Sequence, residues 1–363
     1  MYLRKLSAVI ASVLLFTCSA SALGLSAASA VCIDMDSGRV LYAYNENTPM
    51  QIASTTKIMT ALVVLENCSL EEQVKIPAQA VGIEGSSLYL KTGEILTVRD
   101  LLYGLMLRSG NDAAVALAVH CAGSVEKFAD MMNSKAKQLG LENCSFVNPH
   151  GLSEEGHFCS AGDLAVISVE AMNNPDFAAI VSTVNYTFGN RTVVNHNKLL
   201  RLYDGAVGVK TGFTKSAGRT LVGAAEKDGQ TLITVTLNAP DDWNDHIKLF
   251  DYGFDNYPET EVISKGQVMA RLPVLSSNED TVTVVANEDF NYPLSTDEKV
   301  EIKLHIPDFL FAPLHQGQYV GTAEILFNGQ QIGEVLLSAG HNVAVKEPTK
   351  SPGIIDRILD FLT

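Results

Sequence analysis

The chain is poor in basic residues for its length. Its 363 residues contain 26 Lys and Arg against 41 Asp and Glu, so the formal net charge is −15. A surface of this sign repels nucleic-acid phosphates and anionic lipid headgroups. Nucleic acid is therefore excluded as a main partner, and so is attachment driven by an anionic membrane surface. The charge has no bearing on the fold.

Cysteine is also scarce. The chain has six, and none stands in a C-x-x-C pair, which argues against a zinc ribbon or a dithiol redox motif. Cys18 belongs to the N-terminal leader, and the other five are Cys32, Cys68, Cys121, Cys144 and Cys159. We interpret most of these as small core residues. Their pairing is open, with a Cys144–Cys159 disulfide as one alternative.

The histidines do not form a metal pattern with these cysteines. His120, His150 and His157, taken with Cys121 and Cys159, have spacings that fit no standard zinc site. His120 falls in an apolar helical stretch, which favours a structural role. We therefore expect no metal site and no cofactor.

The apolar run near the N-terminus, residues 6–16, is too short for an ordinary membrane-spanning helix. Two positive charges precede it, and two A-x-A sites follow it, ending at Ala22 and Ala30. These features predict a secretory signal peptide within residues 1–30, cleaved after Ala22 or Ala30. Cys18 lacks the small preceding residues that lipidation requires. The protein is expected to be secreted across a bacterial cytoplasmic membrane, into the cell-wall space.

Apolar periodicity divides the rest of the chain into two parts. A hairpin over 30–45, a helical block and strands over 205–237 predict an α/β (α+β) domain over 31–257. The economical arrangement is one antiparallel sheet built from both ends of this domain, with the helical region inserted between them. Short strands with Gly, Pro and Asp turns predict a small C-terminal β-sandwich over 258–345. Residues 346–363 are predicted to form a linker and a short tail helix.

The segment IASTTKIMTALVVLE, residues 52–66, begins like a helix but carries a misplaced lysine. Ser54 alone would be a good N-cap, yet position 57 is Lys where a capping box has Glu or Gln. Lys57 lies at the positive end of the helix dipole among apolar neighbours, and both effects lower a lysine pKa. A neutral amine one turn from a hydroxyl is a general base beside a nucleophile. We therefore hypothesise that Lys57 accepts the proton of Ser54.

Two further motifs follow in the same domain. Ser109-Gly110-Asn111 lies between two apolar helical stretches, and Lys210-Thr211-Gly212 lies in a β pattern. A loop of capping residues is the plainer interpretation of the first, and an exposed edge-strand lysine of the second. Further copies stand where a solvent-facing helix, a turn or a sandwich loop is expected, at Ser124–Lys127, Ser134–Lys137, Lys91–Gly93 and Ser276–Asn278.

Taken in order, S-x-x-K, S-x-N and K-T-G resemble the three motifs of the active-site serine penicillin-binding proteins and related β-lactamases. The chain is most similar to the low-molecular-mass serine-type D-alanyl-D-alanine carboxypeptidases, through TVRDLLYGLMLRSGNDAAVALA, NPHGL, NHNKLL, GVKTGFTKSAGRTLVGAA and LFDYGF. The resemblance covers about residues 30–345 and implies a β-lactamase/transpeptidase-like catalytic domain. Val207 and His196 depart from the family's habit, which bears on substrate preference.

The resemblance implies a role for the first two motifs. Ser54 would attack the carbonyl between the last two D-alanines of a peptidoglycan stem peptide, with Lys57 as its base. Ser109 would relay a proton to the leaving amine, while Asn111 holds Lys57 and the substrate backbone. β-Lactam antibiotics would acylate the same serine as covalent inhibitors.

The third motif would bind the substrate. Lys210 and Thr211 would receive its terminal carboxylate, since a cation and a hydroxyl suit that anion. Gly212 would let the substrate backbone approach the strand. The backbone N–H groups of Ser54 and Phe213 would form the oxyanion hole.

Other functions stay open at this point. A β-lactamase of the same fold would need a deacylating group, for which Glu154 and Glu155 are the loose candidates. A DD-endopeptidase has the same motifs, and a non-catalytic penicillin or peptidoglycan sensor would have no need of Lys57. Arg219 would either support the carboxylate site or occupy a surface strand position.

The C-terminal residues predict a short amphipathic helix. Its apolar stripe consists of Ile354, Ile355, Ile358, Leu359 and Leu362. It resembles the membrane-surface helix that ends many such carboxypeptidases, but interfacial helices usually carry several Lys or Arg, and here Arg357 stands alone. We expect weak, peripheral contact of residues 354–362 with the outer face of the membrane.

Overall fold

The computed structural model describes residues 23–347. The predicted signal peptide up to Ala22, including Cys18, and the predicted tail helix over 354–362 lie outside the described residues. The chain divides into two compact units, Met1–Asp255 and Asn256–Thr363. None of the helices in the described part is long and apolar enough to cross a membrane.

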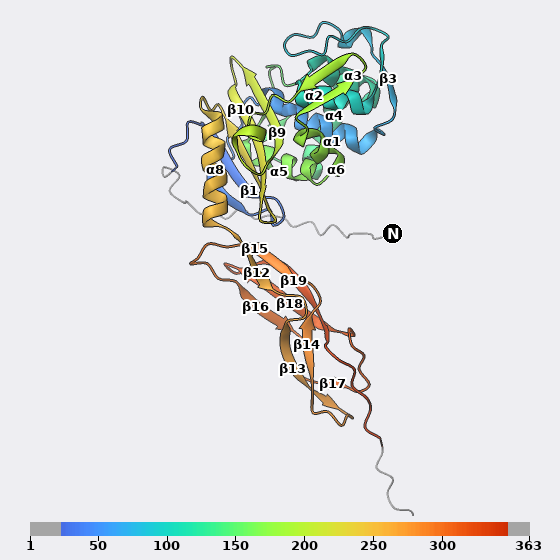
Figure 1. Cartoon of the computed structure of the whole chain (residues 1–363), viewed down its shortest axis with the longest axis vertical. Helices are drawn as coiled ribbons and strands as arrows, with labels where there is room; N and C mark the ends of the chain where they lie inside the picture. Colours follow the sequence, from blue (N-terminus) through green and yellow to red (C-terminus); the bar gives the residue numbers. More distant parts are fainter. Residues whose placement is uncertain (1–22, 348–363) are drawn as a thin grey trace, which may run out of the picture. The chain divides into compact units, whose positions relative to one another are not determined.

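The N-terminal unit is built on a five-stranded antiparallel sheet with the order β2-β1-β11-β10-β9 (Figure 1). The strands are β1 (Ser29–Asp34), β2 (Val40–Tyr44), β9 (Ala206–Thr214), β10 (Gly218–Lys227) and β11 (Gln230–Leu237). The sheet therefore combines both ends of the domain, as predicted. β9, which carries the K-T-G motif, lies at one edge of this sheet.

Turn chemistry explains the hairpin of β10 and β11. Asp228 and Gly229 connect the strands with φ angles of 52° and 88°. This left-handed backbone is open to Gly and comparatively tolerated by Asp, and it matches the twist of the flanking strands. Asp-Gly between two apolar stretches predicts a hairpin from the sequence, and the pairing of β10 with β11 confirms it.

Helices cover both faces of the sheet (Figure 1). On one face, His246 of α8 (Asp242–Asn256) bonds Thr234 and Thr236 of β11. Alternate residues of β11, Ile233 and Val235, belong to the core shared with the inserted helical block. That block contains α1 (Lys57–Asn67), α2 (Val98–Leu107), α3 (Asn111–Ala122), α4 (Val125–Gln138), α5 (Ala161–Met172), α6 (Pro175–Ser182) and α7 (Leu199–Leu202).

Short elements connect the helices of this block. They are two 3-10 turns and three two-stranded pairs: η1 (Ala53–Thr56), η2 (Ala78–Ala80), β3 (Gln73–Lys75) with β4 (Ile95–Thr97), β5 (Cys144–Ser145) with β6 (Phe158–Cys159), and β7 (Asn185–Phe188) with β8 (Arg191–Val194).

Local capping sets several helix ends. Thr97 and Asp100 form a reciprocal capping box at the start of α2, and Ser124 accepts from the backbone of Lys127 at the start of α4. The sequence predicts both caps, because Thr97 and Ser124 each precede a helical pattern, and the structure confirms them. The sequence predicts a closing helix that is capped by Asp241 or Asp242 and ends at Tyr252. That end is wrong, because α8 continues to Asn256, just before Pro258, which cannot extend a helix.

The C-terminal unit consists of strands. A six-stranded sheet has the order β16-β18-β19-β14-β13-β17, and β12 pairs with β15 in a second sheet. The strands are β12 (Glu259–Ile263), β13 (Val268–Leu275), β14 (Thr281–Ala286), β15 (Phe290–Pro293), β16 (Glu301–His305), β17 (Leu310–Phe311), β18 (Tyr319–Phe327) and β19 (Gln330–Ala339). Alternate side chains such as Val282, Val284 and Leu337 form its buried core.

The five cysteines of the described part are free thiols. Cys144 and Cys159 are nevertheless direct cross-strand partners in the β5–β6 pair. The two residues considered as a disulfide are therefore neighbours, but no disulfide joins them in the structure. Cys68 and Cys121 form a second pair of adjacent thiols.

Candidate active site

Ser54 lies in the 3-10 turn η1, which leads directly into α1. Neither η1 nor α1 has a side-chain cap, so the plainer interpretation of Ser54 as an N-cap is wrong. Its hydroxyl oxygen lies 3.0 Å from Lys57 Nζ instead. The turn brings the two side chains of the S-x-x-K motif together, as their spacing on a helix predicts.

Lys57 is fully buried, and its amine contacts three oxygens. Besides Ser54 Oγ, Nζ donates to Asn111 Oδ1 at 2.7 Å and to the His150 carbonyl at 2.6 Å. These two carbonyl oxygens can only accept, whereas a hydroxyl can donate or accept. A neutral amine has two N–H donors for the two carbonyls, and its lone pair then remains for the hydroxyl of Ser54.

The electrostatics favour that neutral form. Burial lowers the pKa of Lys57 well below its ordinary value, and the nearby Lys210 cation lowers it further, while Asp112 opposes the shift. The principal cause is desolvation, because the charged ammonium loses its water in this site. The arrangement is that of a nucleophile beside an amine base.

The S-x-N motif stands at the turn between α2 and α3. Ser109 has a φ of +63°, and its hydroxyl is buried without a hydrogen-bond partner within residues 23–347. An unpaired buried hydroxyl is costly, which suits a group that meets its partner only when a ligand is bound. The side-chain amide of Asn111 is fixed at both ends. Its Oδ1 accepts from Lys57, and its Nδ2 donates to the Glu84 carbonyl.

The K-T-G motif lies on the edge strand β9. Lys210 is buried, and Nζ donates to the Thr211 carbonyl at 2.8 Å. Burial lowers the pKa of Lys210 to about 7. Phe213, the next residue after the motif, is 65% exposed, so the strand edge changes within three residues from a buried amine to an open surface.

Gly212 brings this strand against the serine. A Cβ at Gly212 would lie 2.3 Å from Thr220 Oγ1 and 3.0 Å from the backbone nitrogen of Ser54. Thr220 Oγ1 in turn donates to the Ile52 carbonyl at 3.0 Å. The absence of a side chain at Gly212 therefore lets the chain's own segment 52–54 pack closely against β9. A substrate backbone could use the same freedom.

The segment NPHGL supplies contacts that motif analysis missed. The carbonyl of His150 accepts from Lys57, and Gly151 lies so close that a Cβ there would be 1.9 Å from the Ala53 oxygen. The resemblance already contained this segment, but nothing in its side chains indicates a backbone carbonyl as a ligand.

The ring of His157 supports the η1 turn, which carries Ser54. The N–H of Val147 donates to His157 Nδ1, so the ring proton is on Nε2, which donates to Thr56 Oγ1 at 2.8 Å. Burial, followed by the Lys57 charge, lowers the pKa of His157 to about 4. His157 is therefore neutral at physiological pH and has the structural role that was expected of it.

The lysines of the other S-x-x-K and K-T-G copies are not buried as Lys57 and Lys210 are. Lys127, Lys137 and Lys91 are exposed, and the Ser276–Asn278 loop belongs to the C-terminal unit. Arg219 pairs with Asp242 of α8 through Nε at 2.9 Å, so it has a structural partner.

Two remaining positions bear on function. Glu154 and Glu155 are both exposed, and Glu154 accepts from Asn148. His196 lies near Lys210, and its ring contacts Arg108. Burial lowers the pKa of His196, and the charges of Lys210 and Arg108 lower it further.

Comparisons with known proteins agree with this geometry. Residues 16–241 match the family of D-alanyl-D-alanine carboxypeptidases known as peptidase S11, and residues 257–345 match the C-terminal domain of penicillin-binding protein 5. The chain is 34% identical to the carboxypeptidase DacF of Bacillus subtilis, over 97% of this chain and 96% of that protein. It is 33% identical to DacC of Escherichia coli, over 92% and 86%.

Solved structures give the same result. Penicillin-binding protein 5 from Haemophilus influenzae superimposes with a TM-score of 0.70 at 29% identity, covering 88% of this chain and 98% of that one. PBP3 from Streptococcus pneumoniae does so with a TM-score of 0.76 at 27% identity, covering 88% and 99%. The fold and site define a serine hydrolase of the penicillin-binding class. The chain belongs to the D-alanyl-D-alanine carboxypeptidase family.

Gly151→Ala should destabilise the protein more than Gly156→Ala. The two glycines have nearly the same φ, +83° and +82°, so alanine suffers similar left-handed strain at both. Only at position 151 does the new Cβ collide with backbone, at Ala53, which adds about 1–3 kcal/mol. Denaturant unfolding of both variants measures the difference, and equal losses would show that the tight packing at Ala53 is absent.

Lys210 should make the free energy of unfolding rise with pH between about pH 7 and 10.5. Its folded pKa of about 7 lies below the ordinary 10.5, so in this window the unfolded chain binds more protons. The slope from one such group is at most about 1.4 kcal/mol per pH unit. Denaturant titrations at several pH values should show a smaller slope for Lys210→Met, and no change for the exposed Lys215→Met. An unchanged slope in Lys210→Met contradicts the assignment.

Proposed function

We propose that this chain removes the terminal D-alanine from peptidoglycan stem peptides through an acyl-enzyme on Ser54. The observation that carries the proposal is the buried amine of Lys57, which lies 3.0 Å from Ser54 Oγ and contacts two oxygens that can only accept. As Ser54 attacks the carbonyl carbon, its proton passes to Lys57, and the tetrahedral intermediate forms.

Collapse of this intermediate needs a proton for the leaving amine. The Ser109 hydroxyl, buried and without a partner in the described residues, is suited to pass it on from Lys57. D-Alanine departs, and an ester to Ser54 remains. A water molecule then attacks this ester, with Lys57 as base, and restores the free hydroxyl.

Substrate binding follows from the edge strand. An extended peptide can pair with β9, because edge strands present unpaired backbone groups. Lys210 would receive the terminal carboxylate, assisted by Thr211; an anion there favours the protonated amine and raises its pKa. The backbone N–H groups of Ser54 and Phe213 would hold the oxyanion.

β-Lactam hydrolysis is less well supported. Both glutamates considered for deacylation are exposed, and Glu154 is engaged with Asn148. β-Lactams are therefore expected as covalent inhibitors that acylate Ser54. Endopeptidase action on cross-linked peptides uses the same geometry and differs only in the leaving group, whereas a non-catalytic sensor leaves the buried Lys57 unexplained.

The first described residues bear on where the predicted signal peptide would be cleaved. Ser26 N donates to the Asp245 carboxylate, Ala28 N donates to the Leu237 carbonyl, and β1 starts at Ser29. Cleavage after Ala30 would remove these interactions, whereas cleavage after Ala22 would keep them. We therefore favour cleavage after Ala22. Action outside the cytoplasmic membrane follows from the predicted signal peptide and from the proposed peptidoglycan substrate.

Peripheral membrane contact has a second source of support in the C-terminal unit. Leu275, Phe309 and Phe311 are exposed, and Leu275 pairs with Phe311 between β13 and β17. Val345 bridges Ser277 beside this apolar patch, so the chain leaves the described residues next to it. The patch and the predicted tail helix would thus meet one lipid surface together.

Release of D-alanine from a stem pentapeptide tests the proposed function. Ser54→Ala should abolish it together with the covalent penicillin adduct, which mass spectrometry locates. Lys57→Ala should slow acylation by about 10²- to 10⁴-fold, since it removes the general base. The matched control is Lys127→Ala, in an exposed S-x-x-K of α4, which should change the rate hardly at all. Equal effects at both lysines, or labelling that survives Ser54→Ala, would refute the proposed site.

Sedimentation with liposomes tests membrane contact. The chain from residue 23 to 363 should bind vesicles weakly, and removal of residues 351–363 should release it. Phe311→Ser should weaken binding by roughly tenfold, because part of a buried aromatic side chain is worth about 1.4 kcal/mol. Tyr89→Ser, at an exposed aromatic residue of the N-terminal unit, is the control. If the full chain stays in the supernatant at low salt, the contact does not exist.

A further inference from the structure

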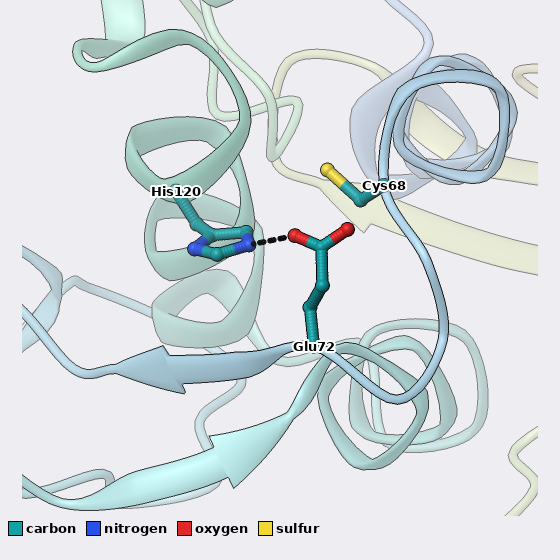
Figure 2. A group of neighbouring side chains, drawn as sticks. All are labelled: Cys68, Glu72 and His120. Carbon is teal, nitrogen blue, oxygen red and sulfur yellow. Dashed lines mark hydrogen bonds and ion pairs between the residues drawn. The ribbon is translucent and has the colours of Figure 1, made fainter.

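Three metal-ligating side chains converge where α1 and α3 end (Figure 2). Cys68 caps the C-terminus of α1, Glu72 precedes β3, and His120 lies in the last turn of α3. Their sulfur, oxygen and nitrogen atoms all lie within 4.8 Å of one another. The cluster is at the opposite end of α1 from Lys57, and the proposed reaction does not use it.

Cys121 is a second cysteine beside this cluster. It follows His120 on α3, and its thiol lies beside the thiol of Cys68. Both cysteines and His120 are half-buried, while Glu72 is exposed. Two thiols, an imidazole and a carboxylate therefore meet at a place that solvent can reach.

The carboxylate is already oriented. Glu72 Oε1 accepts from the backbone N–H of Ser69 at 2.6 Å, and Oε2 accepts from His120 Nε2 at 2.9 Å. The Ser69 contact is an outer hydrogen bond of the kind that orients a metal ligand, whereas the His120 contact joins two atoms that one ion would bind together. A tetrahedral zinc site holds such ligand atoms roughly 3.4–3.8 Å apart, so shifts of about 1 Å would bring the atoms of Cys68, Glu72 and His120 to the distances that one ion requires.

We propose that Cys68, Glu72, His120 and Cys121 bind one zinc ion. Thiolate and imidazole ligands select zinc over magnesium and calcium, which prefer oxygen. Four protein ligands leave no open position, so the site is structural. Its sequence spacing matches no standard pattern, because the ligands come from two helix ends that only tertiary packing brings together.

The zinc ion would fasten the two helices that carry the proposed active site. α1 begins at Lys57 and α3 begins at Asn111, and these two side chains share the 2.7 Å hydrogen bond. The ion would join the opposite ends of the same helices. It would thereby stabilise the helix pair against separation without touching the reacting atoms.

Cadmium titration of the purified, reduced protein without oxygen tests the site. One equivalent of Cd²⁺ should produce a sulfur-to-cadmium absorption band, and Zn²⁺ at about a hundred times its dissociation constant should raise Tm by roughly 5–10 °C. Cys68→Ser should lose about half of the band. His120→Ala should retain the band but bind Cd²⁺ at least tenfold more weakly. Cys144→Ser, in the other thiol pair, should bind Cd²⁺ as the unaltered protein does.

Three results would overturn the site. These are no band in the reduced protein, a full band in Cys68→Ser, or loss of the band in Cys144→Ser. A Cys68–Cys121 disulfide in the oxidised protein, followed by no metal uptake after reduction, would show that the thiols pair with each other instead. Absorbance and Tm are independent of D-alanine release, so this test does not depend on the proposed function.

Discussion

The burial of one amine is the constraint on which the rest of the site depends. Lys57 has no contact with solvent, and its three oxygen contacts come from three separate segments: the η1 turn, the start of α3 and the His150 loop. A charged amine there would be heavily penalised by desolvation. The neutral amine is satisfied by two carbonyl acceptors and one hydroxyl, so the same packing that stabilises the core also prepares a base.

The sheet edge completes this arrangement by bringing a second buried amine close to the first. Lys210 on β9 lowers the pKa of Lys57 through its charge, and its own pKa is lowered by burial. Two amines that cannot both be charged at low cost are suited to different tasks. One can serve as a base, and the other can become charged when an anionic group of a ligand arrives beside it.

Much of the fold follows from local signals. The capping pair of Thr97 and Asp100 gives the start of α2, and Asp228-Gly229 gives the turn of the last hairpin, because both act through nearby backbone groups. The extension of α8 to Asn256 was missed, since its polar last turn lacks a strong apolar pattern. The adjacency of Cys68 to Glu72 and His120 was also missed, because no spacing rule links distant helix ends.

The sequence by itself determined the three motifs, their order and the family they resemble, because residue type and spacing carry that information. It also indicated that Lys57 was misplaced as a solvent-exposed charge. Sequence context also singled out one copy of each motif. Tertiary structure alone decided how deeply the lysine is buried, with Lys57 inaccessible to solvent and Lys127 and Lys137 exposed. It likewise decided that the His150 carbonyl is a ligand of the amine, because a backbone oxygen has no signature in the sequence and is positioned only by packing.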